Sequence, residues 1–380
     1  ARAEDALSSA FESALLTWPE RGVPAQAEAW LLTAARRALI DDVRRQQKHN
    51  ALMQELAILA DEFSDEFDAS AIPDQRLALM FACAHPALDA SVHAPLILQT
   101  ILGLDAASIA SAFLQSPSSM AQKLVRAKAK IRDSRIPFVL PDQSAIPARL
   151  DAVLAAVYSA YADGWSDIEQ SHNLTDEALW LGQLLTQLAP EEPEALGLCA
   201  LMLYLEARRP ARRKANGEYV PLSEQDCSLW HGGMLRAAEK LLKQASSMQR
   251  PGRYQLEAAI QSAHMVRRYQ IKVDWLAIVH LYAQLMQLTA SPVVRINHAI
   301  ALAETAGPHA ALAQLLELED DKRLQDYQPY WAARAHLYAR TGQPAQAEHA
   351  YLRAIGLTTD AAVRQFLQTQ CAACSQKSLK

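Results

Sequence analysis

The stretch GLDAASIASAFLQSPSSMAQKLVRAKAKIRDS, residues 103–134, carries the clearest local pattern in the chain. Asp105 can cap a first helix, which is expected to end at a short turn formed by Gln115 and Ser116. Ser116 followed by Pro117 is typical of the N-cap and the first position of a second helix. Apolar residues then recur at helical spacing, at Met120, Leu124, Ala127 and Ile131. The stretch therefore predicts a helix, a tight turn and a second helix.

The second helix carries an excess of positive charge away from its apolar side. Residues 118–135 contain one acidic residue and six basic ones, which are Lys123, Arg126, Lys128, Lys130, Arg132 and Arg135. A helix-turn-helix needs a second helix of this kind, because its N-terminal part enters the major groove of DNA. The whole chain has a net charge of -5, so the positive charge is local. We predict a helix-turn-helix here, with a plain surface hairpin carrying solvated lysines as the alternative.

Composition limits the possible folds and locations. The 380 residues exceed the roughly 250–300 at which a single hydrophobic core stops growing, so two or three domains are expected. With only 12 glycines and many Ala, Leu, Gln and Glu residues, the chain favours an all-α fold over turn-rich β folds. No uncharged apolar run reaches the roughly 18 residues of a membrane span, so no membrane partner is expected. Five scattered cysteines indicate reduced thiols and a cytoplasmic location.

Two further helices and a linker are predicted before this motif. Residues 3–17 and 27–45 have helical patterns, and the second of these segments is basic. Residues 55–74 contain seven acidic residues and no basic one, which is typical of a flexible linker. Pro95 predicts that the helix before the helix-turn-helix begins late, because proline fits poorly in a helix interior. Since Ala1 already lies in a helical pattern, we expect this sequence to begin inside a longer natural chain.

The C-terminal part has the pattern of paired helices. Gly307 and Gly342 lie 35 residues apart, and each follows a helical segment and precedes a proline. This period is close to the roughly 34 residues of a tetratricopeptide repeat. The last unit also places small and aromatic residues at interlocking positions, namely Trp331, Ala335, Tyr338, Gly342, Ala347, Tyr351 and Ala354. We predict an irregular tetratricopeptide-like domain, with a generic helical bundle as the alternative.

One insertion interrupts the helical pattern. Residues 208–226, RRPARRKANGEYVPLSEQD, combine five basic residues with an Asn-Gly turn. The segment is expected to form either a hairpin loop that contacts an acidic partner or a solvated loop.

No pattern of a catalytic or metal site stands out. The sequence lacks a glycine-rich phosphate loop, a nucleophile elbow and a paired metal-ligand cluster. Cys371 and Cys374 form a Cys-x-x-Cys pair without a second ligand pair. We therefore predict that the chain is not an enzyme and needs no metal or cofactor.

The order of these segments resembles a known family. AEDALSSAF, AWLLTAARRALIDDVRR and RLALMFACAHPALD precede the helix-turn-helix stretch in the order found in the extracytoplasmic-function sigma factors of bacterial RNA polymerase, group 4 of the sigma-70 family. The phrases MAQKLVRAKAKIR, ALMLYLEARRPAR, YQLEAAI and SPVVRINHAIALAE are similar to a subgroup with a large helical C-terminal domain. This resemblance extends over essentially the whole chain.

The resemblance implies a domain order and three sets of site residues. The order is an incomplete sigma region 2 (1–50), an acidic linker (51–75), sigma region 4 (76–138), a second linker (139–150), helical repeats (151–370) and a tail (371–380). Docking on the clamp helices of the polymerase β′ subunit would use Glu4, Asp5, Leu7 and Phe11. The -10 promoter element would be contacted by Trp30, Arg36, Arg37, Arg44 and Arg45. The -35 element would be contacted by Ser116, Ser118, Ser119, Gln122, Lys123, Arg126, Lys128 and Lys130.

The implied function is that of an alternative sigma factor, whose partners are core RNA polymerase, including its β flap, and promoter DNA. The C-terminal domain would then regulate the chain in cis and could bind a protein or peptide. Two other classes stay open: a helix-turn-helix activator with a repeat-type sensor domain, and a tetratricopeptide-like scaffold protein. Neither alternative needs a second basic element about 80 residues before the helix-turn-helix, so the sequence favours the sigma factor.

Overall fold

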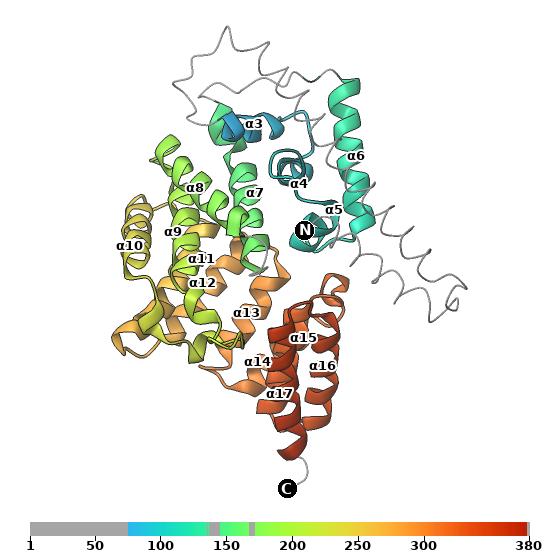
Figure 1. The fold of residues 1–380 in the computed structure, drawn as a ribbon, viewed down its shortest axis with the longest axis vertical. Coiled ribbons are helices and arrows are strands. Elements are labelled where there is room, and N and C mark those ends of the chain that lie inside the picture. Colours follow the sequence, from blue (N-terminus) through green and yellow to red (C-terminus); the bar gives the residue numbers. More distant parts are fainter. Residues whose placement is uncertain (1–74, 135, 137–144, 167–171, 378–380) are drawn as a thin grey trace, which may run out of the picture. The chain divides into compact units, whose positions relative to one another are not determined.

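The computed structural model describes residues 75–134, 136, 145–166 and 172–377. Within these ranges the regular elements are helices, and the one strand-like contact is an isolated antiparallel bridge between Arg213 and Tyr219 (Figure 1). The prediction of an all-α fold is confirmed for this part of the chain.

The helices fall into three groups along the chain. The first group is α3 (Gln75–Cys83), α4 (Ala90–Thr100), α5 (Ala106–Ala112) and α6 (Pro117–Asp133). The second group is α7 (Ile146–Ser166), α8 (His172–Leu188), α9 (Pro193–Ala207), α10 (Gly232–Ser247) and α11 (Arg253–Met265). The third group is α12 (Trp275–Leu288), α13 (Pro292–Leu302), α14 (Pro308–Leu316), α15 (Gln328–Arg340), α16 (Pro344–Leu357) and α17 (Ala361–Lys377). Short 3-10 turns are η3 (Arg209–Arg212), η4 (Leu222–Glu224), η5 (Cys227–Leu229), η6 (Val266–Tyr269) and η7 (Lys322–Leu324).

Helix α4 corrects the prediction made from Pro95. The helix starts at Ala90, so Pro95 lies inside it and is buried. Asp89 makes this early start possible, because its side chain accepts a hydrogen bond from the Ser91 backbone N–H at 2.8 Å. Pro95 has no N–H to donate to the Ser91 carbonyl, so the helix forms with one hydrogen bond fewer.

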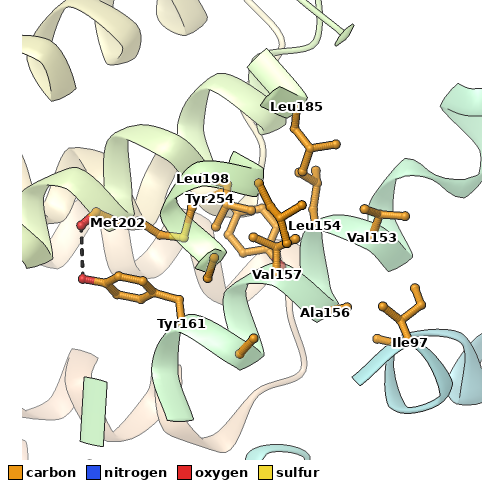
Figure 2. Packing of buried hydrophobic residues seen from close by; sticks show 14 of the residues in the cluster. Ile97, Val153, Leu154, Ala156, Val157, Tyr161, Leu185, Leu198, Met202 and Tyr254 are labelled. Carbon is orange, nitrogen blue, oxygen red and sulfur yellow. Dashed lines mark hydrogen bonds between the residues drawn. The ribbon is translucent and has the colours of Figure 1, made fainter. Parts of the chain in front are cut away.

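Helix α7 joins the first group of helices to the second. It packs against α3, α4 and α5 on one side and against α8 and α9 on the other. Figure 2 shows Ile97 of α4 beside Val153 and Ala156 of α7, within the same set of buried side chains as Met202 of α9. The Tyr161 hydroxyl of α7 donates a hydrogen bond to the Met202 carbonyl at 3.2 Å. The predicted helix-turn-helix region therefore shares one hydrophobic core with the helices that follow it.

Polar contacts reinforce this junction. Arg76 of α3 forms an ion pair with Glu177 of α8, and the Arg149 side chain donates to the Phe81 carbonyl at 3.0 Å. Because both contacts link residues far apart in sequence, they fix α3 relative to the second group of helices.

Helices of the third group that are neighbours in the sequence are also neighbours in space. From α11 to α17, each helix packs against the next one in the chain. Gly307 and Gly342 adopt positive φ angles of 88° and 72°, as required for the sharp turns predicted there. The interlocking small residues of the last unit are buried, at Ala335, Ala347 and Ala354. The helical character of this region is thus confirmed.

Two element boundaries fall outside the ranges predicted for them. Helix α7 starts at Ile146, inside the predicted second linker, and α17 continues to Lys377, inside the predicted tail.

The insertion at 208–226 folds back on the protein. Gly217 has a φ of 84° and closes the turn whose ends meet at the Arg213–Tyr219 bridge. Three guanidinium groups lie 5.7, 5.0 and 4.1 Å from the centre of the Trp165 ring, those of Arg208, Arg209 and Arg212. Arg213 forms an ion pair with Asp360. These arginines are half-buried and make internal contacts, whereas the sequence predicts either a hairpin loop that contacts an acidic partner or a solvated loop.

His264 gives the stability of this region a dependence on pH. Its ring is buried in an edge-to-face contact with Trp275 at 5.4 Å, and its Nδ1 has no hydrogen-bond partner in the structure. Burial, reinforced by Arg267 and Arg208, lowers the pKa of His264 to about 4. The unfolded chain therefore binds one more proton than the folded chain between about pH 6.5 and pH 4. We expect the free energy of unfolding to fall by about 3 kcal/mol across this window as the pH is lowered.

Chemical denaturation of the wild type and of His264→Phe between pH 7.5 and pH 4 measures this contribution. The variant keeps an aromatic ring against Trp275 but cannot titrate, so its unfolding free energy should depend less steeply on pH. Equal slopes in the two proteins would show that another group is responsible.

Candidate nucleic-acid interface

The turn between α5 and α6 is closed by local hydrogen bonds. Asp105 begins α5, accepting hydrogen bonds from the backbone N–H groups of Ala107 and Ser108 at 2.9 and 2.8 Å. After α5, Leu114 adopts a left-handed conformation with a φ of 51°, and the Gln115 N–H donates to the Ala110 carbonyl at 2.9 Å. This pattern ends a helix abruptly, because the backbone turns back over the last carbonyls. The chain can therefore start a new helix two residues later.

Ser116 begins α6 as the sequence predicts. Its hydroxyl accepts a hydrogen bond from the Ser119 N–H at 3.3 Å, and Pro117 occupies the first helical position. The Lys123 side chain donates to the Gln115 side-chain oxygen at 2.9 Å and so ties the second turn of α6 to the loop. The predicted helix, turn and helix are confirmed as local structure, and α4 packs against both α5 and α6.

Helix α6 has a buried side and an exposed polar side. Met120, Leu124 and Ala127 are buried, as the apolar spacing predicts, and Ile131 is half-buried. Six of the residues predicted to contact the -35 element are exposed, namely Ser116, Ser118, Ser119, Gln122, Arg126 and Lys130. Ser118, Gln122 and Arg126 succeed one another at intervals of four, so they lie along one side of the helix. We define these three residues and Ser119 as the α6 polar face.

The lysines of α6 make contacts within the motif or are half-buried. Lys128 is half-buried, and burial lowers the pKa of its amine. Lys123 is also half-buried, and the exposed Lys130 donates to the Ala87 carbonyl at 2.5 Å. These contacts hold the motif together, whereas Arg126 has no ion pair within the described part of the chain. Arg126 is therefore the cation of the predicted set that is best placed to contact a ligand.

Sequence reasoning missed Val125. This residue is 67% exposed, although it is an apolar residue on a helix with a well-formed buried side. Its signal in the sequence is that it lies off the stripe of Met120, Leu124 and Ala127. On a helix that enters the major groove, such a side chain is suited to contact the methyl group of thymine.

A cavity of about 620 Å³ lies beside the turn. Phe113 and Leu114 line one part of it, and Tyr158 of α7 and Tyr282 of α12 line others. Burial raises the pKa of both tyrosine hydroxyls, which therefore stay protonated and can donate hydrogen bonds. The lining also contains the ion pair of Arg253 and Glu257 in α11, 2.8 Å apart. A molecule in this cavity would touch both the turn and the C-terminal helices.

The described residues contain no group of three or more His, Cys, Asp or Glu side chains placed to hold a metal ion. Cys371 and Cys374 both lie in α17, and burial raises the pKa of the Cys371 thiol. None of the helices that the structure covers has the length and apolar character needed to cross a membrane.

The other predicted site residues lie in the first 74 residues, outside the described part of the chain. They are Glu4, Asp5, Leu7 and Phe11 of the polymerase-binding set, and Trp30, Arg36, Arg37, Arg44 and Arg45 of the -10 set. The predicted acidic linker also lies there.

Comparisons with known proteins give one relative and one family match. A protein of Rhizobium meliloti (strain 1021), described as uncharacterized, is 38% identical to this chain over 377 residues. The match covers 97% of this chain and 89% of the relative. The chain belongs to the family of this Rhizobium protein. Residues 149–246 of the present chain, from α7 to α10, also match DUF6596, a family of unknown function. No solved structure matches the chain.

Proposed function

We propose that this chain is an alternative sigma factor that docks on core RNA polymerase and directs initiation at promoters with -10 and -35 elements. The observation that carries the proposal is the α6 polar face. It lies on a capped helix, directly after a tight turn and opposite a buried apolar side. This is the arrangement in which a helix-turn-helix presents its second helix to the major groove.

The chemistry of the α6 polar face suits DNA. An exposed glutamine can form two hydrogen bonds with adenine, and an exposed arginine can do the same with guanine. Ser118 and Ser119 lie in the first turn, where their exposed hydroxyls and the helix dipole favour a phosphate group. Gln122 and Arg126 would therefore select bases, and the first turn would position the helix on the backbone.

The α6 polar face supports DNA binding, and the sequence before α3 supports docking on polymerase. The resemblance there includes a helix suited to dock on polymerase and a basic helix suited to the -10 element, at residues 3–17 and 27–45. A DNA-binding protein that acts without polymerase needs neither helix. The C-terminal helices, with their tetratricopeptide-like pattern, would hold the helix-turn-helix in position, since α7 shares its core.

A second candidate is an activator with a sensor domain, and the 620 Å³ cavity favours it. Its volume lies within the range of small-molecule sites, and a ligand there would contact Leu114 in the turn. An activator of this kind would bind duplex DNA without core polymerase.

Selection of promoter DNA tests the proposal. The full-length chain is mixed with bacterial core RNA polymerase, and bound duplexes are recovered from a random pool at fixed salt concentration. Enrichment of two sequence elements at a fixed spacing is expected. Replacing Gln122 with alanine should relax the preference at one position of the upstream element, by roughly 1–3 kcal/mol. A recovered pool without any enriched element would contradict the proposal, and enrichment without core polymerase would favour the activator.

Val125 provides a separate prediction about base preference. Thymine differs from uracil by one methyl group, and burial of one such group contributes about 0.8 kcal/mol, or about fourfold in affinity. We expect deoxyuridine at one thymine of the upstream element to weaken holoenzyme binding about fourfold. Competition binding with Val125→Ala should show much less discrimination between the two bases. If the variant retains the full discrimination, another side chain contacts the methyl group.

A further inference from the structure

Arg334 is a buried cation in the last helical unit. Its residue is 8% exposed, and its guanidinium group lies among three aromatic rings of the same helix, α15. The ring centres of Tyr330, Trp331 and Tyr338 are 5.5, 5.2 and 5.7 Å from the guanidinium carbon. A charge at such a depth is costly unless its hydrogen-bonding groups are satisfied.

The hydrogen bonds of Arg334 are incomplete. Nη1 donates to the Tyr330 hydroxyl at 3.2 Å, and Nη2 donates to the Tyr338 hydroxyl at 3.1 Å. Nη2 also contacts the carboxylate of Glu319 at 3.2 Å, but the Glu319 side chain is 62% exposed. The buried Nε has no partner in the structure. A guanidinium group has five N–H donors in a planar fork. Since not all of them are used here, the Arg334 side chain can still donate hydrogen bonds to an anionic ligand.

A cavity of about 300 Å³ lies next to this arginine. Its lining comes from α15 and α16: Trp331, Arg334, Tyr338, Ala345, Gln346, His349 and Ala350. The cavity therefore combines one buried arginine and an aromatic wall with a counter-charge, that of Glu319, which lies largely in solvent.

We propose that this cavity binds a carboxylate group of a peptide partner, with Arg334 as the charged anchor. Trp331 and Tyr338 would pack against the residue that carries the carboxylate. The volume suits one residue rather than a large cofactor, because it is at the lower end of small-molecule sites. Ala345, Gln346 and His349 are exposed at its α16 side, so a peptide chain can continue from the cavity along this helix. The C-terminal domain would thus bind an acidic or C-terminal residue of a peptide partner.

Nuclear magnetic resonance of the arginine Nε–H groups tests this site in the full-length chain. The Arg334 signal is assigned with Arg334→Lys, and the wild type is titrated at constant ionic strength with three probes. N-acetyl-alanyl-alanine carries a free terminal carboxylate, its C-terminal amide lacks the charge, and sodium propionate is a free acid without peptide groups. We expect the Arg334 Nε–H signal to shift with the free dipeptide. Binding of the amide should be about tenfold weaker or more, because it lacks a charge-assisted hydrogen bond.

A substitution at the rim of the cavity separates loss of binding from loss of folding. Ala345→Phe fills part of the cavity at an exposed position, so the Arg334 signal should keep its position but no longer respond to the dipeptide. Ala345→Ser is the matched control and should respond as the wild type does. An unshifted signal with the dipeptide, or equal binding of dipeptide and amide, would overturn the carboxylate site. Propionate binding as tightly as the dipeptide would overturn the peptide assignment.

Discussion

Replacing Arg126 with alanine should weaken binding of the holoenzyme to its -35 element by roughly 5- to 150-fold, or about 1–3 kcal/mol. Arg126 is exposed on the α6 polar face and has no ion pair within the described residues, so its guanidinium group is free to contact a base. Because this contact would be to a base, the loss should be much smaller on a duplex whose -35 element is scrambled. Fluorescence anisotropy with both duplexes measures the difference.

Arg132→Ala is the matched control for this prediction. Arg132 is also exposed on α6, but it lies in the last turn and contacts Asp133 at 3.3 Å. Removal of the Arg132 side chain should change the affinity for both duplexes alike. It should also reduce the dependence of this affinity on salt concentration by the amount that one phosphate contact contributes. Equal effects of Arg126→Ala on cognate and scrambled DNA would assign Arg126 to the phosphate backbone instead of a base.

Leu154→Ala should lower the free energy of unfolding by about 2–5 kcal/mol, the usual cost of removing a buried leucine side chain. Leu154 is fully buried in α7, within the core that joins α4 to α9 (Figure 2). This is a large fraction of the roughly 5–15 kcal/mol that stabilises a folded protein. Denaturation followed by circular dichroism gives the size of the effect.

Hydrogen exchange shows whether the effect spreads through the shared core. We expect amides of α4 and α9 to lose protection together in Leu154→Ala, since both helices pack on α7. Leu352→Ala, at an exposed leucine in α16, is the control and should change stability by less than about 0.5 kcal/mol. Continued protection of α4 while α9 exchanges faster would show that the helix-turn-helix region is stable without α7.

The shared core also affects how regulation by the C-terminal domain should be tested. Deletion of residues 151–380 removes most of α7 and all helices after it, so α3, α4 and α5 would lose the surface against which they pack. A change in transcription after this deletion is expected from loss of stability alone. Single substitutions that leave the core intact, such as Ala345→Phe, are better probes of control.

Features fixed by local chemistry could be predicted from the sequence. Asp105 and Ser116 cap their helices, and Gly342 adopts the left-handed angle that its turn requires, because each depends on neighbouring residues. The buried side of α6 also follows from spacing alone. Pro95 misled the prediction because the helix, capped by Asp89, continues through it despite the hydrogen bond that proline removes.

Features fixed by distant contacts could not be predicted. The sequence places Lys128 in the set predicted to contact the -35 element, but the fold half-buries it beside buried Cys83. The sequence at 208–226 predicts a solvated loop or a hairpin that contacts an acidic partner, yet arginines in it contact Trp165 and Asp360, which are distant in the sequence. The site at Arg334 likewise depends on packing between α15 and α16, so periodicity alone gives no sign of its cavity.

Promoter-dependent initiation is the most direct test of the proposed function. Full-length chain and bacterial core RNA polymerase are combined on a template selected as described above, and transcripts from a fixed start site are measured. Transcripts that require both the chain and the -35 element, and that fall sharply with Arg126→Ala, are predicted. A chain that neither associates with core polymerase nor changes its start-site choice would contradict the assignment as a sigma factor.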